Sequence, residues 1–354
     1  MLRHRKLSIV LTAVVLGIAA CNDDTTTAPT LETSQTLAAY TVRPLAIPAN
    51  AFTGEASSVN NAGIAAGWYR NNQGDFAVRW TTPTQMQSLG SLPGFANTLA
   101  KGINNAGTIV GFSISANFLN SHAWIWTAAG GIKPLADLGG GASLAQAINT
   151  SGVAVGWAFD ANGLEHAVRW SATGVLTDLN PPGATSEALA INDSGDVVGW
   201  VFPVGGSATR AHLWRHNGTQ KDLGTLGGAS SQAFAVNNAL MVIGVSDQRS
   251  PKPEVAFVWT PGVGMRALGM GPHSQGLGLS NKGRSVGLMI SSGVTGLSIF
   301  QGVKAVLPDV DPAKGPFSGP TSVNLCGTIV GSSSSPQPTN GNPVPAIWTK
   351  AGCD

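Results

Sequence analysis

Short apolar stretches separated by glycine-containing turns recur along the chain with a period of about 44 residues. In each repeat an aliphatic residue precedes an Asn-x-x-Gly segment or a close variant of it. A further glycine follows about four residues later, at Gly67, Gly111, Gly156, Gly199, Gly244, Gly287 and Gly331. The spacings between these glycines are 44, 45, 43, 45, 43 and 44 residues. So regular a period indicates a repeat protein in which each repeat is one supersecondary unit.

Each repeat predicts a first pair of short strands joined by a hairpin. The first strand ends at the aliphatic residue, such as Val59 or Ile103, and a small residue precedes it. This alternation of large and small side chains is typical of a strand. The Asn-x-x-Gly segment predicts the turn, because Asn bonds nearby backbone and Gly accepts a positive φ. The second strand runs to the later glycine, where we expect neighbouring backbone to approach closely.

The third strand of each repeat is predicted to end in an aromatic residue. These residues are Trp80, Trp126, Trp170, Trp214, Trp259, Phe300 and Trp348. Large rings that recur at the repeat spacing are expected to form the core between sheets. The fourth strand contains a leucine and leaves through Gly or Pro, as in residues 89–94 and 223–228.

The last repeat lacks a fourth strand, since the chain ends at Asp354 soon after Trp348. Residues 41–48 resemble the fourth strand at 175–182, so we expect the N-terminal strand to complete the last repeat. A ring closed in this way has no exposed sheet edges. The prediction is therefore an all-β chain with a β-propeller of seven four-stranded blades over residues 39–354. A β-solenoid is the alternative, but its coils repeat at shorter periods and need no such closure.

The N-terminus predicts export. Basic residues Arg3, Arg5 and Lys6 precede an uncharged apolar run at 7–20, which is typical of a signal peptide and too short to span a bilayer comfortably. Residues 1–20 end in Ile-Ala-Ala before Cys21 and resemble a bacterial lipobox. The resemblance implies that Cys21 is lipidated and becomes the new N-terminus. The alternative is an ordinary secretory signal followed by a chance cysteine.

Two features follow from export. Residues 21–38 are Thr-rich with few bulky apolar side chains, which predicts a flexible tether. Once Cys21 is lipidated, Cys326 and Cys353 remain as a pair. An oxidising compartment favours a disulfide between them, which would hold the C-terminal end of the closing blade; two free thiols are the alternative.

Charge and composition exclude some partners. The chain has 20 Lys and Arg against 18 Asp and Glu. Three of the basic residues lie in the signal peptide, so 17 remain and the mature net charge is −1. Without a basic cluster, nucleic acid is not an expected partner. Charged residues make up 11% of the chain, against about 25% in typical domains, which fits a turn-rich extracytoplasmic β protein.

The repeat resembles the HAF family of bacterial extracellular repeats, which is named for His-Ala-Phe at the start of the third strand. The Asn-x-x-Gly-x-x-x-Gly segments match well, and the Leu-Gly-x-Leu-Gly-Gly exit matches best at 223–228. Residues 122–124 and 166–168 keep the His, whereas 76–77, 210–211 and 255–256 do not. The resemblance covers nearly all of residues 41–350. It implies an exported, propeller-like protein and brings no catalytic residues.

Loops between the second and third strands differ most between repeats. They cover residues 70–75, 113–121, 160–165, 203–209, 247–254 and 332–344. In propellers these loops and the connections between blades share the face around the channel mouth. We expect function on this face, because variable loops on a repeated frame commonly carry it.

Two pairs of side chains raise the possibility of a metal. His122 and His166 occupy equivalent positions in adjacent repeats, either as metal ligands or as the residue that the repeat prefers there. We favour the second interpretation, since no Cys or acidic partner recurs with them. Asp309 and Asp311 lack the full spacing of a calcium loop and predict a solvated loop. No metal or cofactor is therefore expected.

Other motifs are weaker still. Trp68, Trp157 and Trp200 could stack on sugar rings, but packing between blades is the favoured interpretation. Glycines 139–141 and 227–228 lack the Lys-Ser/Thr and helix of a phosphate loop, which indicates turns. No Gly-x-Ser-x-Gly elbow with partnered His and Asp is found.

These observations favour a non-catalytic binding or scaffold protein of the cell envelope, expected to be a monomer with a glycan or protein ligand. The lipid anchor would attach it to the outer membrane or cell surface, or to a periplasmic face. The alternative is a propeller enzyme, a lyase or hydrolase acting on a polysaccharide or other envelope substrate. Acidic or basic side chains from several blades meeting at the channel mouth would favour the enzyme, whereas Ala, Ser and Gly there would count against it. A purely structural or adhesive surface protein is a third hypothesis.

Overall fold

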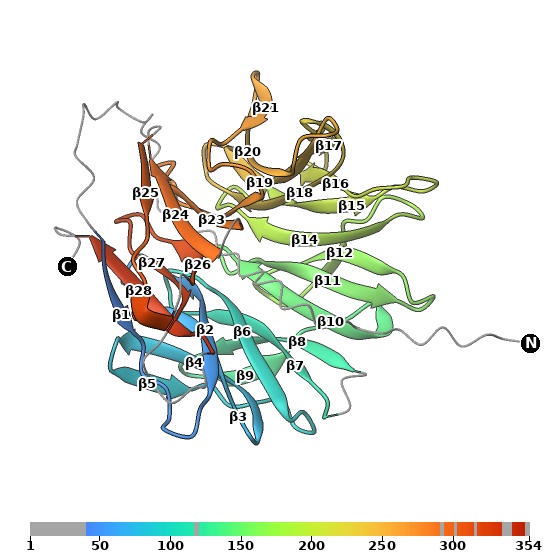
Figure 1. Cartoon of the computed structure of the whole chain (residues 1–354). Coiled ribbons are helices and arrows are strands. Elements are labelled where there is room, and N and C mark those ends of the chain that lie inside the picture. Colours follow the sequence, from blue (N-terminus) through green and yellow to red (C-terminus); the bar gives the residue numbers. More distant parts are fainter. Residues whose placement is uncertain are drawn as a thin grey trace, which may run out of the picture.

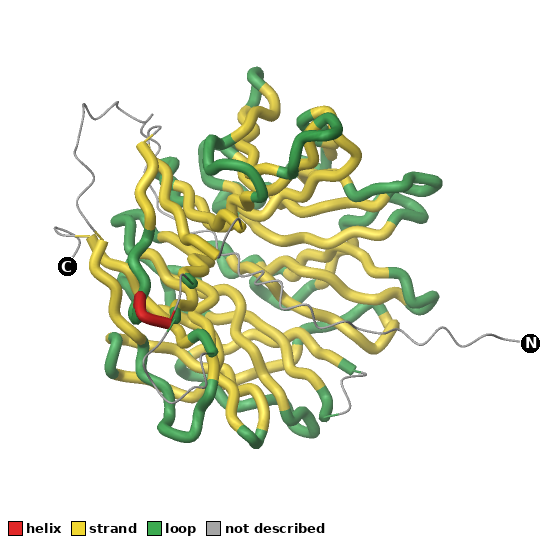
Figure 2. The backbone as a smooth tube through the Cα atoms, in the orientation of Figure 1, coloured by secondary structure: helices red, strands yellow, loops and turns green. Residues whose placement is uncertain are grey.

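The computed structural model describes residues 40–116, 120–290, 294–300, 303–314, 317–334 and 342–350. Within these ranges the chain is built from β-strands and one short 3-10 helix, Pro312–Lys314. The prediction of an all-β chain is thereby confirmed (Figure 2). The predicted signal peptide at 1–20, the predicted tether at 21–38 and Cys21 lie outside the described residues. Among the described residues, no helix has the length and apolar character needed to cross a membrane.

Four-stranded antiparallel meanders follow one another along the described chain, and we name them units one to seven. Unit one contains β2 (Thr53–Val59), β3 (Ala65–Asn71), β4 (Gly74–Thr82) and β5 (Gln85–Ser88). Unit two contains β6 (Asn97–Ile103), β7 (Ile109–Ile114), β8 (Ser121–Thr127) and β9 (Gly131–Pro134). Unit three contains β10 (Gly139–Ile148), β11 (Ala154–Asp160), β12 (Glu165–Trp170) and β13 (Leu176–Asp178).

The remaining units repeat this order. Unit four contains β14 (Thr185–Ile191), β15 (Val197–Phe202), β16 (Arg210–Trp214) and β17 (Gln220–Asp222). Unit five contains β18 (Gly227–Val236), β19 (Val242–Gln248), β20 (Val255–Thr260) and β21 (Gly264–Ala267). Unit six contains β22 (Ser274–Leu279), β23 (Ser285–Ile290), β24 (Val294–Phe300) and β25 (Val303–Val306). Unit seven contains β26 (Ser318–Val323), β27 (Ile329–Ser333), β28 (Val344–Lys350) and β1 (Tyr40–Pro44).

Unit seven takes its fourth strand from the other end of the chain. Strand β1 pairs antiparallel with β28, so that Val42 lies opposite Trp348. Figure 1 shows the blue β1 beside the red β28. Units two and three share one eight-stranded sheet only because a single parallel bridge joins Ser121 to Ala142.

The first strands of the units lie next to one another in chain order. Strand β2 contacts β6, and the series continues through β10, β14, β18, β22 and β26. Strand β26 in turn contacts β2, so the series returns to its start. The sheets are accordingly arranged around a common centre (Figure 1), and we call these seven strands the inner strands.

The turn asparagine of the repeat has two roles. In unit one, Asn60 Oδ1 accepts the backbone N–H groups of Ala62 and Ile64, which fixes the turn. Its Nδ2 donates to the carbonyl oxygen of Asn104 in unit two at 3.2 Å. Equivalent bonds between units run from Asn104 to Asn149, Asn149 to Asn192, Asn192 to Asn237, Asn237 to Ser280 and Asn324 to Asn60. Unit six has Ser280 here and cannot donate in the same way.

The later glycine of each repeat lies where two strands meet closely. A Cβ atom at any of the seven positions would lie only 1.9 to 2.1 Å from a backbone carbonyl oxygen of the inner strand. This confirms the predicted close approach of backbone. Next to the glycine the inner strand has a bulge, as between Ala56 and Ser58. The residues skipped in pairing at these bulges are Ser57, Lys101, Gln146, Leu189, Phe234, Leu277 and Thr321.

The aromatic residues at the end of the third strands lie in the core, as predicted. The six tryptophans of this series are each no more than 5% exposed. Three of them also donate their indole N–H to a carbonyl oxygen of the preceding unit. These bonds run from Trp80 to Ala46, from Trp170 to Ala136 and from Trp348 to Pro308, at 2.6 to 2.7 Å. The rings thus fill the space between units and tie neighbouring units together.

Candidate functional site

The bulged residues of the inner strands divide the centre into an apolar and a polar part. Leu189, Phe234 and Leu277 belong to one buried apolar cluster. The bulged residues of units one to three are Ser57, Lys101 and Gln146 instead. Reactive or ligand-binding groups at the centre are therefore to be sought on β2, β6, β10 and their neighbours.

Two glutamates flank this polar part at the same position of the repeat. Glu55 lies opposite Trp68, and Glu187 lies opposite Trp200 in unit four. The Glu187 carboxylate accepts Gln146 Nε2 and Trp200 Nε1, each at 3.0 Å. The Glu55 carboxylate accepts the Ser57 hydroxyl at 3.3 Å and a hydrogen bond from the Trp68 side chain. Protein donors thus hold both carboxyl groups in place.

Lys101 is the cation that acts on both glutamates. Burial raises the pKa of Glu55, and the nearby Lys101 ammonium and the donors Ser57 and Trp68 offset part of that rise. Burial also raises the pKa of Glu187, offset in part by Gln146, Trp200 and Lys101. In both cases the cost of removing the charge from water exceeds the gain from the partners.

Glu165, the first residue of β12, adds a third carboxyl group. Burial, followed by the repulsion of Glu187, raises the pKa of Glu165 to about 8. The side chain is half-buried, and within the described residues it has no hydrogen bond or ion pair. Glu165 therefore carries its proton at neutral pH and can still interact with a ligand. We name Glu55, Lys101, Gln146, Glu165 and Glu187 the acidic cluster.

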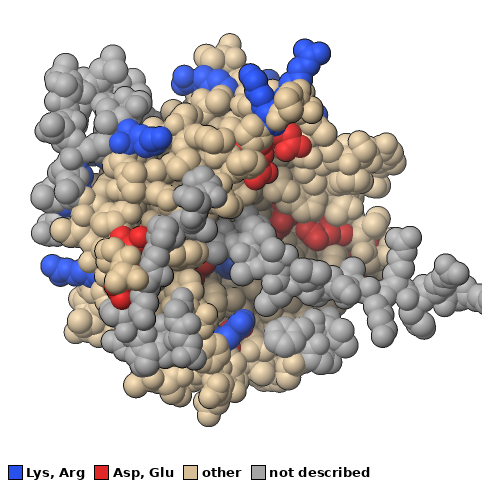
Figure 3. Space-filling view, viewed as in Figure 1, with Lys and Arg blue, Asp and Glu red and all other residues tan. Residues whose placement is uncertain are grey.

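The acidic cluster lies towards the end of the units that carries the loops between second and third strands. Glu165 directly follows such a loop, and Glu55 and Glu187 lie in the first half of their strands, away from the asparagine turns. Figure 3 shows acidic atoms gathered over β12 to β18 on the visible face, with few basic atoms among them. The face expected to carry function is therefore mainly negatively charged over these strands.

The pH dependence of stability provides a test of Glu165. In the unfolded chain its carboxyl group ionises above about pH 4.5, whereas in the folded protein it stays neutral up to about pH 8. The free energy of unfolding should therefore fall between pH 5 and pH 8. We expect Glu165→Gln to flatten this fall and to raise the free energy of unfolding at pH 9 by on the order of 2 kcal/mol. Urea unfolding at pH 5, 7 and 9 measures both effects.

The control for this prediction is Glu254→Gln in unit five, outside the acidic cluster. This variant should keep the pH dependence of the original protein. Equal slopes for Glu165→Gln and the original protein would show that Glu165 is ionised in the folded state at neutral pH.

The expectation that no acidic partner recurs with the two histidines was wrong, because each has a carboxylate partner within its own unit. His166 Nδ1 lies 2.8 Å from Asp178 Oδ2, and His122 Nδ1 lies 3.9 Å from Asp137 Oδ2. Arg210, at the same repeat position in unit four, forms an ion pair of 3.2 Å with Asp222. The side chain at this repeat position therefore links the third strand to a carboxylate at the end of the fourth strand, or just after it, in the same unit. Among the described residues, no group of three or more His, Cys, Asp or Glu side chains is placed to hold a metal.

Trp68, Trp157 and Trp200 are all half-buried. Trp157 packs against Phe159 with ring centroids 5.2 Å apart. The indoles of Trp68 and Trp200 bond the glutamates of the acidic cluster, a role that neither sugar stacking nor packing between blades had suggested. The sequence signal for the cluster was weak. Glu55 and Glu187 are charged residues among small and apolar ones in strands expected to be buried.

The remaining candidates lie away from the acidic cluster. Burial raises the pKa of Asp309, which accepts the Phe317 N–H and hydroxyl groups, and Asp311 accepts the Ala313 N–H. The glycine runs were predicted to form turns, but they begin the strands β10 and β18, where Gly139, Gly141 and Gly227 have positive φ angles of 90°, 76° and 99° beside irregularities in the pairing. Cys326 is exposed and takes part in a disulfide. Cys353 lies outside the described residues, so its pairing with Cys326 stays a prediction.

Comparison with solved structures places this fold among known ones. The β-propeller domain of the Trilobed protease from Pyrococcus furiosus is 8% identical over 89% of this chain and 94% of its own, with a TM-score of 0.54. A puromycin hydrolase mutant is 13% identical over 83% of this chain and 53% of its own, with a TM-score of 0.53. The fold is that of a β-propeller.

TolB from Acinetobacter baumannii is 13% identical over 73% of this chain, with a TM-score of 0.46. This chain spans 65% of the length of TolB and about half of the puromycin hydrolase chain. No family model and no curated protein sequence matches the chain. At these identities the likeness concerns the fold alone.

Proposed function

We propose that the protein is a lipid-anchored β-propeller of the cell envelope that binds a ligand at its acidic cluster. In this proposal units one to seven are the seven blades, and β1 closes the last one. The bond from Asn324 to Asn60 and the contact between β26 and β2 support the closure. Export by the signal peptide at 1–20, lipidation of Cys21 and membership of the HAF family belong to the same proposal.

The binding proposal rests mainly on the burial of the Glu165 carboxyl group beside Glu187, which raises the pKa of Glu165 to about 8. Glu165 shares its surroundings with Glu187, and among the described residues Lys101 is the cation that acts on Glu55 and Glu187. A cationic group placed beside Glu165 would favour ionisation and receive an ion pair in a site of low water content. We therefore propose a ligand with a free amino group, carried by a glycan or by a protein.

Binding of a small amine tests this proposal. We expect glucosamine to stabilise the full-length chain at pH 7.5, by about 2.7 kcal/mol at a hundredfold excess over its Kd. N-acetylglucosamine has the same ring without the charge and should give no stabilisation. Calorimetry in two buffers with different ionisation enthalpies should detect proton release on binding, because Glu165 has to ionise.

Variants separate the acidic cluster from other sites. Glu165→Gln should abolish the proton release and weaken amine binding at least about tenfold, whereas Glu254→Gln should change neither. A protein ligand would be detected in the same assay with an oligolysine peptide in place of glucosamine. If neither amine stabilises the protein, or if N-acetylglucosamine does so equally well, the amine-binding proposal is wrong.

An enzyme is the second candidate, favoured by the pairing of Glu165 with Glu187. One carboxyl group that holds a proton beside one with a different environment is the arrangement used for acid and base in glycoside hydrolysis. Against it, both oxygens of Glu187 already accept hydrogen bonds from the protein. Turnover of a polysaccharide that is lost in both Glu165→Gln and Glu187→Gln would establish the enzyme in place of the binding protein.

A further inference from the structure

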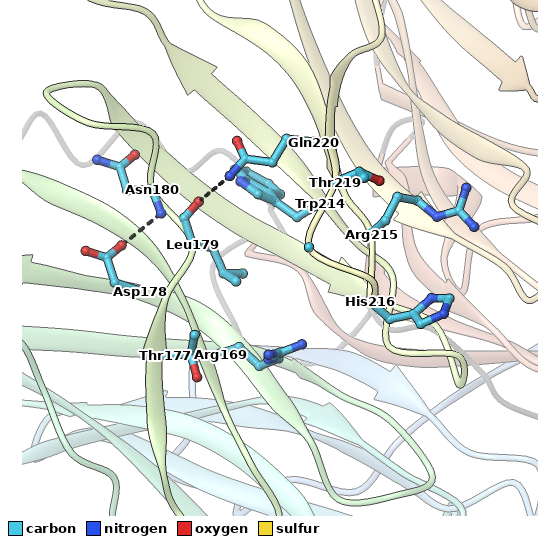
Figure 4. A pocket seen from close by; sticks show the side chains of 11 residues that line it. Arg169, Thr177, Asp178, Leu179, Asn180, Trp214, Arg215, His216, Thr219 and Gln220 are labelled. Atoms are coloured by element: carbon cyan, nitrogen blue, oxygen red, sulfur yellow. Dashed lines mark hydrogen bonds between the residues drawn. The ribbon is translucent and has the colours of Figure 1, made fainter.

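A second site lies between units three and four, apart from the acidic cluster. A pocket of about 240 Å³ opens between the end of β13 and the β16–β17 hairpin. Its walls include Leu179 and Asn180 on one side and Trp214, Thr219 and Gln220 on the other (Figure 4). This volume lies below the usual range of drug-sized pockets, so it suits a single small ring.

One residue of the pocket wall has a buried hydrogen-bond donor without a partner. Trp214 is 3% exposed, and its indole Nε1 makes no hydrogen bond. The equivalent indoles of Trp80 and Trp170 donate to a carbonyl oxygen 34 residues earlier in the chain. For Trp214 that residue is Asn180, which forms part of the opposite wall of the pocket. The pocket therefore lies at the place where units one and three have a hydrogen bond from an indole N–H to a carbonyl oxygen of the preceding unit.

A second nitrogen on the same strand is also without a partner. His212 lies two residues before Trp214 on β16, with the ring centroids 4.8 Å apart. Its Nε2 is buried and makes no hydrogen bond, although the ring has a hydrogen bond to the Gln220 side chain and is not among the residues that line the pocket. Burial lowers the pKa of His212, so the ring is neutral at physiological pH. Because a buried polar group without a partner costs free energy, two such groups on one face indicate that something polar is missing beside them.

The charges around the pocket favour an anion. Arg169 lines it and forms no hydrogen bond or ion pair within the described part of the chain. In Figure 4 its side chain extends towards the β16–β17 turn. The carboxylate of Asp178, also in the wall, is already occupied by His166 at 2.8 Å and by the Asn180 N–H at 2.8 Å. Asp178 therefore forms no ion pair with Arg169 in the described part of the chain, and its negative charge stays in the pocket wall.

The other basic side chains of the pocket are held elsewhere. Arg215 Nε and His216 Nδ1 both bond Asp196 Oδ1, at 3.0 and 2.9 Å. Figure 4 shows both side chains directed away from Leu179. The Gln220 amide donates weakly to Leu179 O at 3.4 Å, and the Thr177 and Thr219 side chains complete the polar lining. Arg169 is thus the donor of the pocket wall that remains available for an anion, and the buried Trp214 N–H becomes a second donor only if the wall moves apart.

We propose that the pocket between units three and four binds a small hydroxylated carboxylate of the size of one uronic acid. Its carboxylate would accept from the Arg169 guanidinium and the Trp214 indole N–H, and its hydroxyl groups would meet Gln220 and the threonines. Bidentate pairing with a carboxylate is the interaction for which a guanidinium is suited. The site prefers an anion, whereas the acidic cluster prefers a cation, so either proposal can fail without the other.

The test is a titration of the full-length chain with glucuronate, followed by calorimetry and by tryptophan fluorescence. We expect saturable binding of glucuronate and none of glucose, which has the hydroxyl groups without the carboxylate. Arg169→Gln should weaken binding at least about tenfold, since a charge-assisted bond is lost. Trp214→Phe should weaken it about fivefold, because it removes one neutral donor and keeps most of the ring.

Matched controls exist in unit one. Arg79 occupies the position of Arg169 but contacts Gln87 and the Trp126 ring, and Trp80 already donates to Ala46. Arg79→Gln and Trp80→Phe should leave glucuronate binding unchanged. Trp80→Phe should lower the melting temperature more than Trp214→Phe, because only the first loses a hydrogen bond. Absence of glucuronate binding, equal binding of glucose, or equal effects of Arg79→Gln and Arg169→Gln would overturn the proposal.

Discussion

We expect Gly156→Ala to destabilise the protein by about 3–5 kcal/mol, enough to leave much of the chain unfolded under mild conditions. The added Cβ would lie 1.9 Å from the carbonyl oxygen of Leu144 and 3.0 Å from the Cα of Ala145. Both neighbours are backbone of the inner strand β10, so no side chain can rotate away. The clash can be relieved only if β10 and β11 separate beside the bulge.

Urea unfolding of Gly156→Ala and Gly319→Ala provides the comparison. Gly319 lies in the inner strand β26. The nearest heavy atom to a Cβ added at Gly319 is the Ser332 hydroxyl oxygen, 3.4 Å away. Gly319→Ala should therefore stay within about 1 kcal/mol of the original protein. If the two variants lose similar stability, the close approach of β10 and β11 is not what selects glycine at position 156.

The second large effect is expected for the turn asparagine of unit three. Asn149 is 1% exposed, its Oδ1 accepts the Val153 N–H at 2.9 Å, and its Nδ2 donates to Asn192 O at 3.2 Å. Asn149→Ala removes both bonds and leaves buried backbone groups without partners. We expect a loss of about 2–4 kcal/mol in the free energy of unfolding.

A serine at this position separates the two roles of the asparagine. Unit six has Ser280 here, whose Oγ accepts the Arg284 N–H at 3.1 Å, so the turn is kept. Asn149→Ser should lose only the bond between units three and four, which corresponds to about 1 kcal/mol. Calorimetric unfolding of the two variants measures the difference. If serine is as damaging as alanine, the turn does not depend on a side-chain acceptor.

The repeat and its strands could be predicted because their causes are local. The alternation around Val59, the Asn-x-x-Gly turn and the recurring tryptophans all act over a few residues, and each recurs at a constant period. The period also indicated that β1 belongs with the last repeat. The bond from Asn60 to Asn104 was not predicted, since it joins residues of two repeats whose relative placement the pattern does not contain.

The acidic cluster and the pocket exist only because different repeats are packed against each other. Glu55, Lys101, Glu165 and Glu187 come from four different units, and they influence each other only because the inner strands lie side by side. Likewise, Trp214 looks like its equivalents in the sequence, and only the packed structure shows that its indole N–H has no partner.

The sequence by itself therefore determined the all-β class, the repeat, the turns and the aromatic core, because propensity and periodicity are properties of short segments. The tertiary structure decided which charged and polar groups meet across units. Burial and the distance between side chains set pKa values and leave hydrogen-bond donors unpaired, and both quantities exist only once the units are packed.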